Sequence, residues 1–186
     1  MTCHSIIFYL VICEWSHERK LRTTHFMLTG GTLDSQFDPS KDTVVTAEKT
    51  NVPEYVEKLK LHNPAEFSML FMKDGREIRY KDREKLLEKV RKSPHKMVII
   101  THGTYTMPDT GQYLKDHLPK NDKTIVLIGS LIPLKGFDLS DAPFNLGYAV
   151  AKVQSLRAGV YLYMNGKVFD PDQVDKNRIE ARFEEL

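Results

Sequence analysis

Cysteine is scarce in this chain of 186 residues: only Cys3 and Cys13 occur, both close to the first residue. A disulfide framework across the core is therefore excluded, and such cysteine usage is typical of a reducing compartment. On this basis we expect a cytoplasmic protein. The apolar run over residues 5–13 is far shorter than the roughly 20 residues that a membrane-spanning helix needs. We therefore expect no membrane partner.

An excess of charge of either sign is also missing. The 27 basic and 25 acidic residues are well mixed and give a net charge of +2. Because nucleic-acid-binding domains usually carry a basic stripe, we expect no nucleic-acid partner. Hydrophobic residues make up 41% of the chain and charged residues 28%, as in ordinary globular domains. A domain of this size buries roughly 70% of its unfolded surface, so it can form a core without disulfides.

The first 22 residues differ from the rest of the chain. Their apolar run has no basic residues ahead of it, unlike the run of a secretory signal. Three interpretations stay open: an extra edge strand, a disordered extension, or an upstream start that is not native, of which we favour the last two. We assign residues 1–22 to an N-terminal extension and residues 23–186 to one α/β domain.

Short apolar segments alternate with helical patterns along this domain. The apolar segments are mostly unalternating, as expected for strands that are covered on both faces. Strands are predicted at residues 23–28, 67–72, 97–100, 125–128 and 160–164. Helices are predicted at residues 53–61, 82–91, 109–118 and 140–156. The alternation predicts a three-layer α/β sandwich with a doubly wound, mainly parallel sheet and right-handed crossovers.

Two of the predicted strands end in turns that combine glycine with threonine. Residues 29–32 read TGGT, and residues 101–104 read THGT. The carboxyl ends of adjacent parallel strands border the crevice in which open α/β folds bind ligands. A threonine beside exposed backbone N–H groups suits nucleophilic attack on a carbonyl carbon. Each turn alone is also compatible with a tight glycine turn whose hydroxyl bonds the local backbone.

The segments after these turns predict different local structures. Residues 35–39 and the polar residues after them are predicted to form a loop, not the long helix of a dinucleotide-binding site. Asp109 is predicted to cap the helix that follows the second turn. We interpret His102 as a packed, hydrogen-bonded histidine.

The two turns, taken as residues 29–33 (TGGTL) and 101–107 (THGTYTM), resemble the signature motifs of the bacterial-type L-asparaginase/glutaminase family. The likeness continues through residues 129–133 (GSLIP), 140–146 (SDAPFNL) and 164–170 (MNGKVFD). It covers about residues 23–180, and residues 169–178 are similar to the short, single-domain branch. The resemblance implies an asparaginase N-terminal-like domain that hydrolyses a small amide, asparagine or a related compound, and releases ammonia. It implies no cofactor and no metal.

The resemblance also implies roles for individual residues. Thr32 matches the nucleophile that attacks the amide carbonyl, and Thr104 matches a second threonine that acts with a lysine. Lys176 aligns with that lysine, and it can serve as a base only if burial lowers its pKa. Its charged neighbourhood is equally compatible with a solvated surface lysine. The predicted substrate-binding positions are Gly31, Gly75, Arg76, Gly103 and Tyr105.

Three features depart from the family pattern. Tyr105 stands where the family carries an aspartate that binds the α-ammonium group of the substrate, and a neutral phenol cannot replace that charge. Gly75 stands in place of a serine that holds the α-carboxylate, with the cation of Arg76 beside it. Residues 34–53 lack the tyrosine that the family's mobile lid supplies. The resemblance therefore predicts the type of reaction more closely than the head group of the substrate.

These departures leave an alternative function open: an asparaginase-like domain that binds a small ligand without turnover. Phosphate or nucleotide binding at the glycine turns is less favoured, because no Walker-type Gly-Lys-Ser/Thr follows either turn. The family's two-domain members complete each site with a second domain, which has no counterpart in this sequence. By analogy we expect a homodimer or a higher homo-oligomer.

Overall fold

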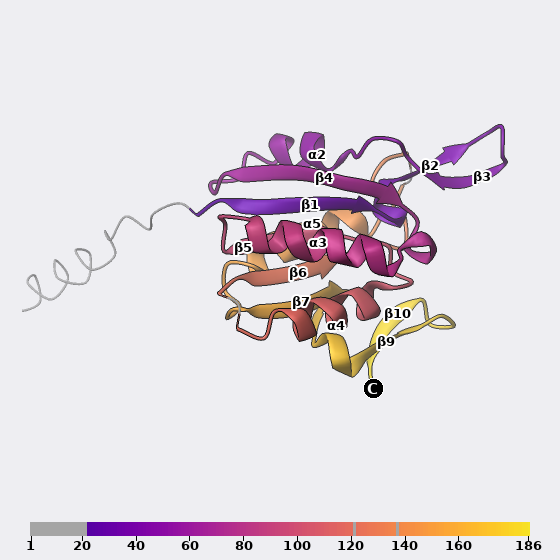
Figure 1. Cartoon of the computed structure of the whole chain (residues 1–186). Helices are drawn as coiled ribbons and strands as arrows, with labels where there is room; N and C mark the ends of the chain where they lie inside the picture. Colours follow the sequence, from indigo (N-terminus) through magenta and orange to yellow (C-terminus); the bar gives the residue numbers. More distant parts are fainter. Residues whose placement is uncertain (1–21, 121, 137) are drawn as a thin grey trace, which may run out of the picture.

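Six strands form the central sheet of the computed structural model, which describes residues 22–120, 122–136 and 138–186 (Figure 1). Across the sheet they are β4 (Ala65–Lys73), β1 (Thr24–Gly30), β5 (Met97–Thr101), β6 (Thr124–Ile128), β7 (Gly159–Met164) and β8 (Lys167–Phe169). The first five run parallel, and β8 pairs antiparallel with β7. The five predicted strands are confirmed, each within two residues of its predicted limits.

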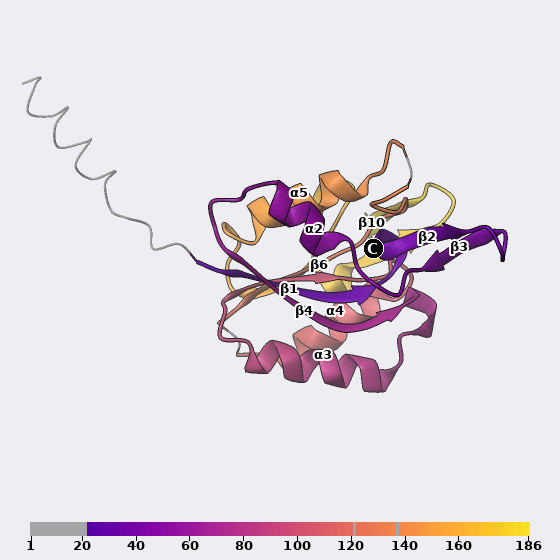
Figure 2. The same ribbon diagram turned by 90° about the horizontal axis from the view of Figure 1, so that it is seen from above.

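Helices cover both faces of this sheet, as Figure 2 shows. On one face lie α3 (Tyr80–Lys92) and α4 (Met107–His117); on the other lie α2 (Val52–Lys58) and α5 (Ala142–Lys152). The strands are apolar on both sides for this reason. Along β1, Met27 packs under α3 and α4, whereas Phe26 and Leu28 pack under α2 and α5. The predicted three-layer α/β sandwich is confirmed.

The four predicted helices are present, with shifted ends. Helix α4 begins at Met107 with Pro108 in its first turn, where the fixed φ of proline suits a helix start. Asp109 therefore lies inside the first turn, and its predicted role as the helix cap is wrong. Helix α5 ends at Lys152, before its predicted limit at residue 156, and the residues after it form a turn.

One crossover differs in hand from the others. From β4 to β5 and on to β6 the chain moves in one direction across the sheet, with α3 and α4 on the same face. From β6 to β7 it continues in that direction, yet α5 lies on the opposite face. This last crossover therefore has the opposite hand, and the expectation of right-handed crossovers throughout is wrong. To reach the far face, the chain after β6 passes across the carboxyl ends of the strands.

Two hairpins lie at the carboxyl ends of the sheet strands (Figure 1). Strands β2 (Ser35–Asp38) and β3 (Thr43–Thr46) pair antiparallel, so the predicted loop after residue 34 is wrong. Strands β9 (Val174–Asn177) and β10 (Arg182–Glu185) form the second hairpin. Short 3₁₀ turns complete the elements: η1 (Thr32–Asp34), η2 (Gly75–Glu77) and η3 (Pro171–Gln173).

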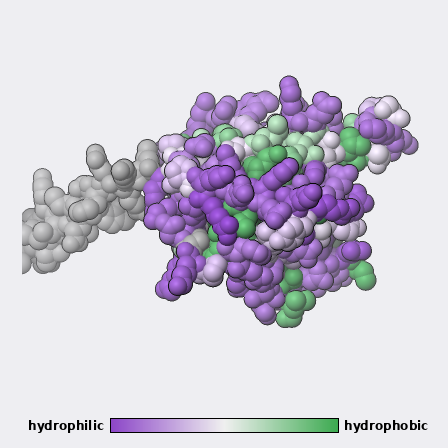
Figure 3. Space-filling view, in the orientation of Figure 1, coloured by the Kyte–Doolittle hydropathy of each residue, from purple (hydrophilic) through white to green (hydrophobic). Residues whose placement is uncertain are grey.

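The surface over α3 and α4 is mostly hydrophilic, with hydrophobic residues gathered along the edge strand β4 (Figure 3). No helix within the described ranges is long and apolar enough to cross a membrane. The predicted N-terminal extension lies outside the described residues, except for Arg22.

Candidate active site

The candidate site lies at the carboxyl ends of β1 and β5, where the strand order reverses. From β1 the chain moves to β4 on one side and then to β5 on the other. Ligands of open α/β sheets bind at such switch points. Side chains tie the two strand ends together: Thr29 Oγ1 donates to the carbonyl oxygen of Thr101 at 2.6 Å, and Thr29 N donates to Thr101 Oγ1 at 3.3 Å. The prediction that the two Gly/Thr turns lie side by side is confirmed.

Three glycines pack backbone to backbone at this point. A Cβ atom at Gly31 would lie 2.5 Å from Gly103 N, and Gly31 has a φ of +82°, which side chains rarely adopt. A Cβ atom at Gly103 would lie 2.4 Å from Gly75 Cα, and one at Gly75 would lie 3.0 Å from the Gly103 backbone. The turns that carry Thr32 and Thr104 are thus in direct backbone contact. The missing side chain at residue 75 has a packing reason, since a serine would press on this contact.

Lys176 contacts Thr104 across a sequence separation of 72 residues. Strand β9 places Lys176 Nζ 2.7 Å from Thr104 Oγ1, so the ammonium or amine group bonds the hydroxyl directly. Thr104 is 4% exposed and Lys176 is half-buried. Burial lowers the pKa of Lys176, the cation of Arg178 lowers it further, and the carboxylate of Asp74 opposes both. This contact favours a lysine that belongs to the site over a solvated surface lysine.

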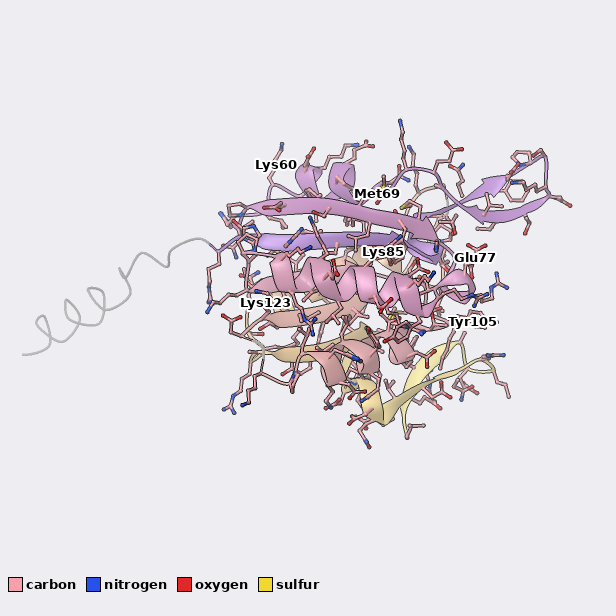
Figure 4. The ribbon with its side chains drawn as sticks, in the orientation of Figure 1. Lys60, Met69, Glu77, Lys85, Tyr105 and Lys123 are labelled. Atoms are coloured by element: carbon pink, nitrogen blue, oxygen red, sulfur yellow. The ribbon has the colours of Figure 1, made fainter. Side chains whose placement is uncertain are left out.

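Tyr105 follows Thr104 and stands among cations. The centroid of its ring lies 4.9 Å from Arg178 Cζ, 5.1 Å from Lys176 Nζ and 5.4 Å from Arg76 Cζ. Arg76 also forms an ion pair with Asp74, Nε to Oδ1 at 2.8 Å. Figure 4 shows Tyr105 and Glu77 at one end of the sheet, opposite Lys123. Asp74 and Arg178 could not be identified as site residues from the sequence, because both lie in ordinary charged segments.

Thr32 begins the 3₁₀ turn η1 and is partly exposed. Two residues later, Asp34 is fully buried, and burial raises the pKa of its carboxyl group to about 6 although Thr50 Oγ1 donates to Oδ1 at 2.8 Å. The other carboxyl oxygen, Oδ2, has no hydrogen-bond partner among the described residues. Asp34 thus connects the end of the Thr32 turn to the residues just before α2. Its carboxyl group is poorly solvated, which disfavours the ionised form.

His102, which belongs to the second threonine turn, is completely buried. Its Nδ1–H donates to the carbonyl oxygen of Gly103 at 2.8 Å, and burial lowers the pKa of the ring to about 4. The neutral imidazole is therefore held in place by its neighbour in the chain. This geometry agrees with the interpretation of His102 as a packed histidine.

The loop after β6 closes another side of the site. A Cβ atom at Gly129 would lie 2.9 Å from Thr104 Cγ2, so this loop packs directly on the threonine. The carboxylate of Asp141 accepts hydrogen bonds from the backbone N–H groups of residues 131 and 132. Asn145 Nδ2 donates to the carbonyl oxygen of Gly129 at 2.9 Å. Helix α5 thereby positions the loop that covers Thr104.

A cavity of about 800 Å³ lies elsewhere, beside the β2–β3 hairpin, and its lining includes Phe37, Val45 and Lys135. Neither Thr32 nor Thr104 lines this cavity. Within the described part of the chain, no group of three or more His, Cys, Asp or Glu side chains is placed to hold a metal ion.

Residues 24–183 match the family model described as asparaginase, N-terminal. The chain belongs to the asparaginase family. The resemblance seen in the two threonine motifs is thereby confirmed for the N-terminal domain of this family.

Individual asparaginases agree with this assignment. The glutaminase-asparaginase of Acinetobacter glutaminasificans is 40% identical over 90 residues, which covers 47% of this chain and 27% of that protein. The thermostable L-asparaginase from Thermococcus kodakarensis has the same fold, with a TM-score of 0.75 at 22% identity over 88% of this chain and 51% of that one. The probable cytoplasmic L-asparaginase from Campylobacter jejuni gives a TM-score of 0.73 at 29% identity over 84% and 50%. This chain spans about half the length of both structures.

Proposed function

We propose that this asparaginase-family chain hydrolyses a small amide, asparagine or a related compound, and releases ammonia, with Thr32 as the nucleophile. The observation that carries the proposal is the 2.7 Å contact between Lys176 Nζ and Thr104 Oγ1. It joins a half-buried lysine to a hydroxyl beside the turn that bears Thr32. Burial lowers the pKa of Lys176, so the neutral amine, which is the form that can accept a proton, is more populated than in a surface lysine.

The reaction has two steps. Thr32 Oγ1 attacks the amide carbonyl carbon, the carbon–nitrogen bond breaks, and ammonia leaves from an ester formed on Thr32. Neutral Lys176 accepts the proton lost by the attacking hydroxyl, relayed through Thr104 Oγ1, and returns it to the leaving nitrogen. Water then cleaves the ester to the carboxylic acid and restores Thr32. The sum is one amide and one water giving one acid and one ammonia.

The remaining predicted site residues receive roles within the same proposal. Gly31 and Gly103 allow the two turns to approach each other, and the backbone of Gly75 packs against that of Gly103. Tyr105 and Arg76 face the part of the substrate away from the reacting amide. We also propose the cytoplasm as the compartment, from the cysteine usage, and a homodimer or higher homo-oligomer as the assembly.

Ammonia release from a panel of small amides tests the function. We expect the wild-type protein to release ammonia and the Thr32→Ala variant to be slower by at least about 100-fold. Ser155→Ala, which changes an exposed serine between α5 and the amino end of β7, is the matched control and should leave the rate unchanged. Equal rates for wild type and Thr32→Ala on every amide would contradict the proposal. Thermal stabilisation by an amide that is not consumed would favour the binding-domain alternative.

A further inference from the structure

Three basic side chains surround the ring of Tyr105, and the nearby carboxylates of Asp74 and Glu77 both act on one of them, Arg76. Arg76, Lys176 and Arg178 all lie within 5.4 Å of the ring centroid, measured to Cζ or Nζ. One carboxylate, that of Asp74, forms an ion pair in this group, and its partner is Arg76. Among the described residues, neither Lys176 nor Arg178 forms an ion pair. Lys176 still has the carboxylate of Asp74 in its electrostatic surroundings, so Arg178 is, in the part of the chain that the structure describes, the cation of this group without an anionic partner.

Lys176 and Arg178 differ in the groups that they can bind. Lys176 already donates to Thr104 Oγ1, which directs its nitrogen toward the reacting hydroxyls. Arg178 is exposed, and among the described residues it has no hydrogen bond to protein atoms, so its contact is with the ring of Tyr105. A guanidinium held on an aromatic ring keeps its planar N–H donors free for a carboxylate, which it can bind in bidentate fashion.

An amino-acid amide would bring an unfavourable charge to this place. Its α-ammonium group would enter a site that contains the unpaired guanidinium of Arg178, and like charges repel one another. A carboxylate would instead find Arg178 free and Arg76 nearby. The charge pattern thus selects against the ammonium group while favouring the carboxylate.

We propose that the preferred substrates are small amides that carry a carboxylate and lack an ammonium group, with Arg178 as the residue that binds this carboxylate. The inference rests on the proposed amide hydrolysis and names its substrate class. Succinamate is the simplest such compound, because it is asparagine without the amino group. Butyramide has the same chain length with a methyl group in place of the carboxylate.

Kinetics with these three amides test the inference. We expect kcat/KM for succinamate to exceed that for asparagine and for butyramide by at least about 10-fold each. Arg178→Ala should reduce the ratio of succinamate to butyramide by at least about fivefold, mainly through KM. Because both substrates use the same Lys176, any effect of Arg178 on its protonation cancels from this ratio. Arg157→Ala, which removes an exposed arginine before the amino end of β7, should leave the ratio unchanged.

Adding a negative charge at residue 105 gives the complementary test. Tyr105→Asp adds a carboxylate beside Arg76 and Arg178, and we expect it to raise the ratio of asparagine to succinamate by at least about 10-fold. Asparagine equal to or better than succinamate in the wild type would overturn the inference while leaving amide hydrolysis intact. An unchanged succinamate-to-butyramide ratio in Arg178→Ala would also overturn it.

Binding separates this inference from the proposed function. If no amide is hydrolysed, the proposed function fails, and calorimetry with succinate decides the inference. Weaker succinate binding in Arg178→Ala but not in Arg157→Ala supports the carboxylate site. Equal binding by both variants overturns it.

Discussion

The contact between Gly103 and Gly75 should make Gly103→Ala one of the more destabilising single-methyl additions in this fold. The new Cβ atom would lie 2.4 Å from Gly75 Cα and 2.5 Å from Gly75 N. Ordinary contacts of such atoms begin at 3.4 Å, so the two backbones must separate by about 1 Å. Neither neighbour can turn away as a side chain would, because both are backbone atoms.

The size of the effect follows from the cost of overpacking, which is typically about 1–3 kcal/mol. We take about 2–3 kcal/mol here, because backbone and not side chain must move. For a chain of this length, 1 kcal/mol corresponds to roughly 2–4 °C in Tm. The expected loss in Tm is therefore roughly 4–12 °C, measured by circular dichroism during heating.

Gly147→Ala is the matched control. Gly147 lies in helix α5, is exposed, and has no atom within 4 Å of its added Cβ. Alanine is the better helix former by about 1 kcal/mol, so this variant should gain roughly 2–4 °C. A Tm for Gly103→Ala equal to or above that of the wild type would refute the close approach of the two turns, and with it the geometry of the site.

Three further predictions concern titratable groups. Lys176→Met should lower the rate of ammonia release by at least about 100-fold. Lys120→Met, which changes an exposed lysine in a turn, should leave this rate unchanged. Equal losses of rate in both variants would contradict a role for Lys176 in the mechanism. In the wild type the rate should rise with pH through the pKa of Lys176, because the neutral amine is the active form. Arg178→Ala should move this rise in rate to higher pH, and Asp74→Asn should move it to lower pH. Shifts of both variants in the same direction would contradict the effects assigned to the two charges. The folded pKa of Asp34, about 6, lies above its ordinary value of 3.8, so the stability due to this group is present below pH 4 and is lost as pH rises through 6. In urea unfolding between pH 4 and 8, the wild type should therefore lose about 2–3 kcal/mol relative to Asp34→Asn, and parallel pH dependences would refute the buried carboxylate.

The sheet and the position of the site could be predicted because their signals are local. Apolar runs that end in Gly/Thr turns mark β1 and β5, and parallel pairing alone brings their carboxyl ends together. The β2–β3 hairpin gave a weaker signal. It mixes polar residues with Phe37, Val44 and Val45, most of its residues are at least partly exposed, and its strands pair only with each other, so no buried face imposes a pattern on the sequence.

The state of Lys176 could not be predicted, for a different reason. In the sequence it stands among charged residues and looks solvated, whereas in the fold the β9–β10 hairpin carries it onto Thr104. Its lowered pKa results from burial and from the cation of Arg178, which no local pattern encodes. The reversed hand of the β6–α5–β7 crossover was missed similarly, because the general preference for right-handed connections predicts the other face for α5.

The covalent role of Thr32 is the central claim, and partition of its ester between water and hydroxylamine tests it most directly. Succinamate and the monomethyl ester of succinate would form the same ester on Thr32 after losing ammonia or methanol. We therefore predict one ratio of hydroxamate to acid from both substrates, and no hydroxamate from either with Thr32→Ala. Different ratios from the two substrates, or a hydroxamate that persists in Thr32→Ala, would contradict the claim.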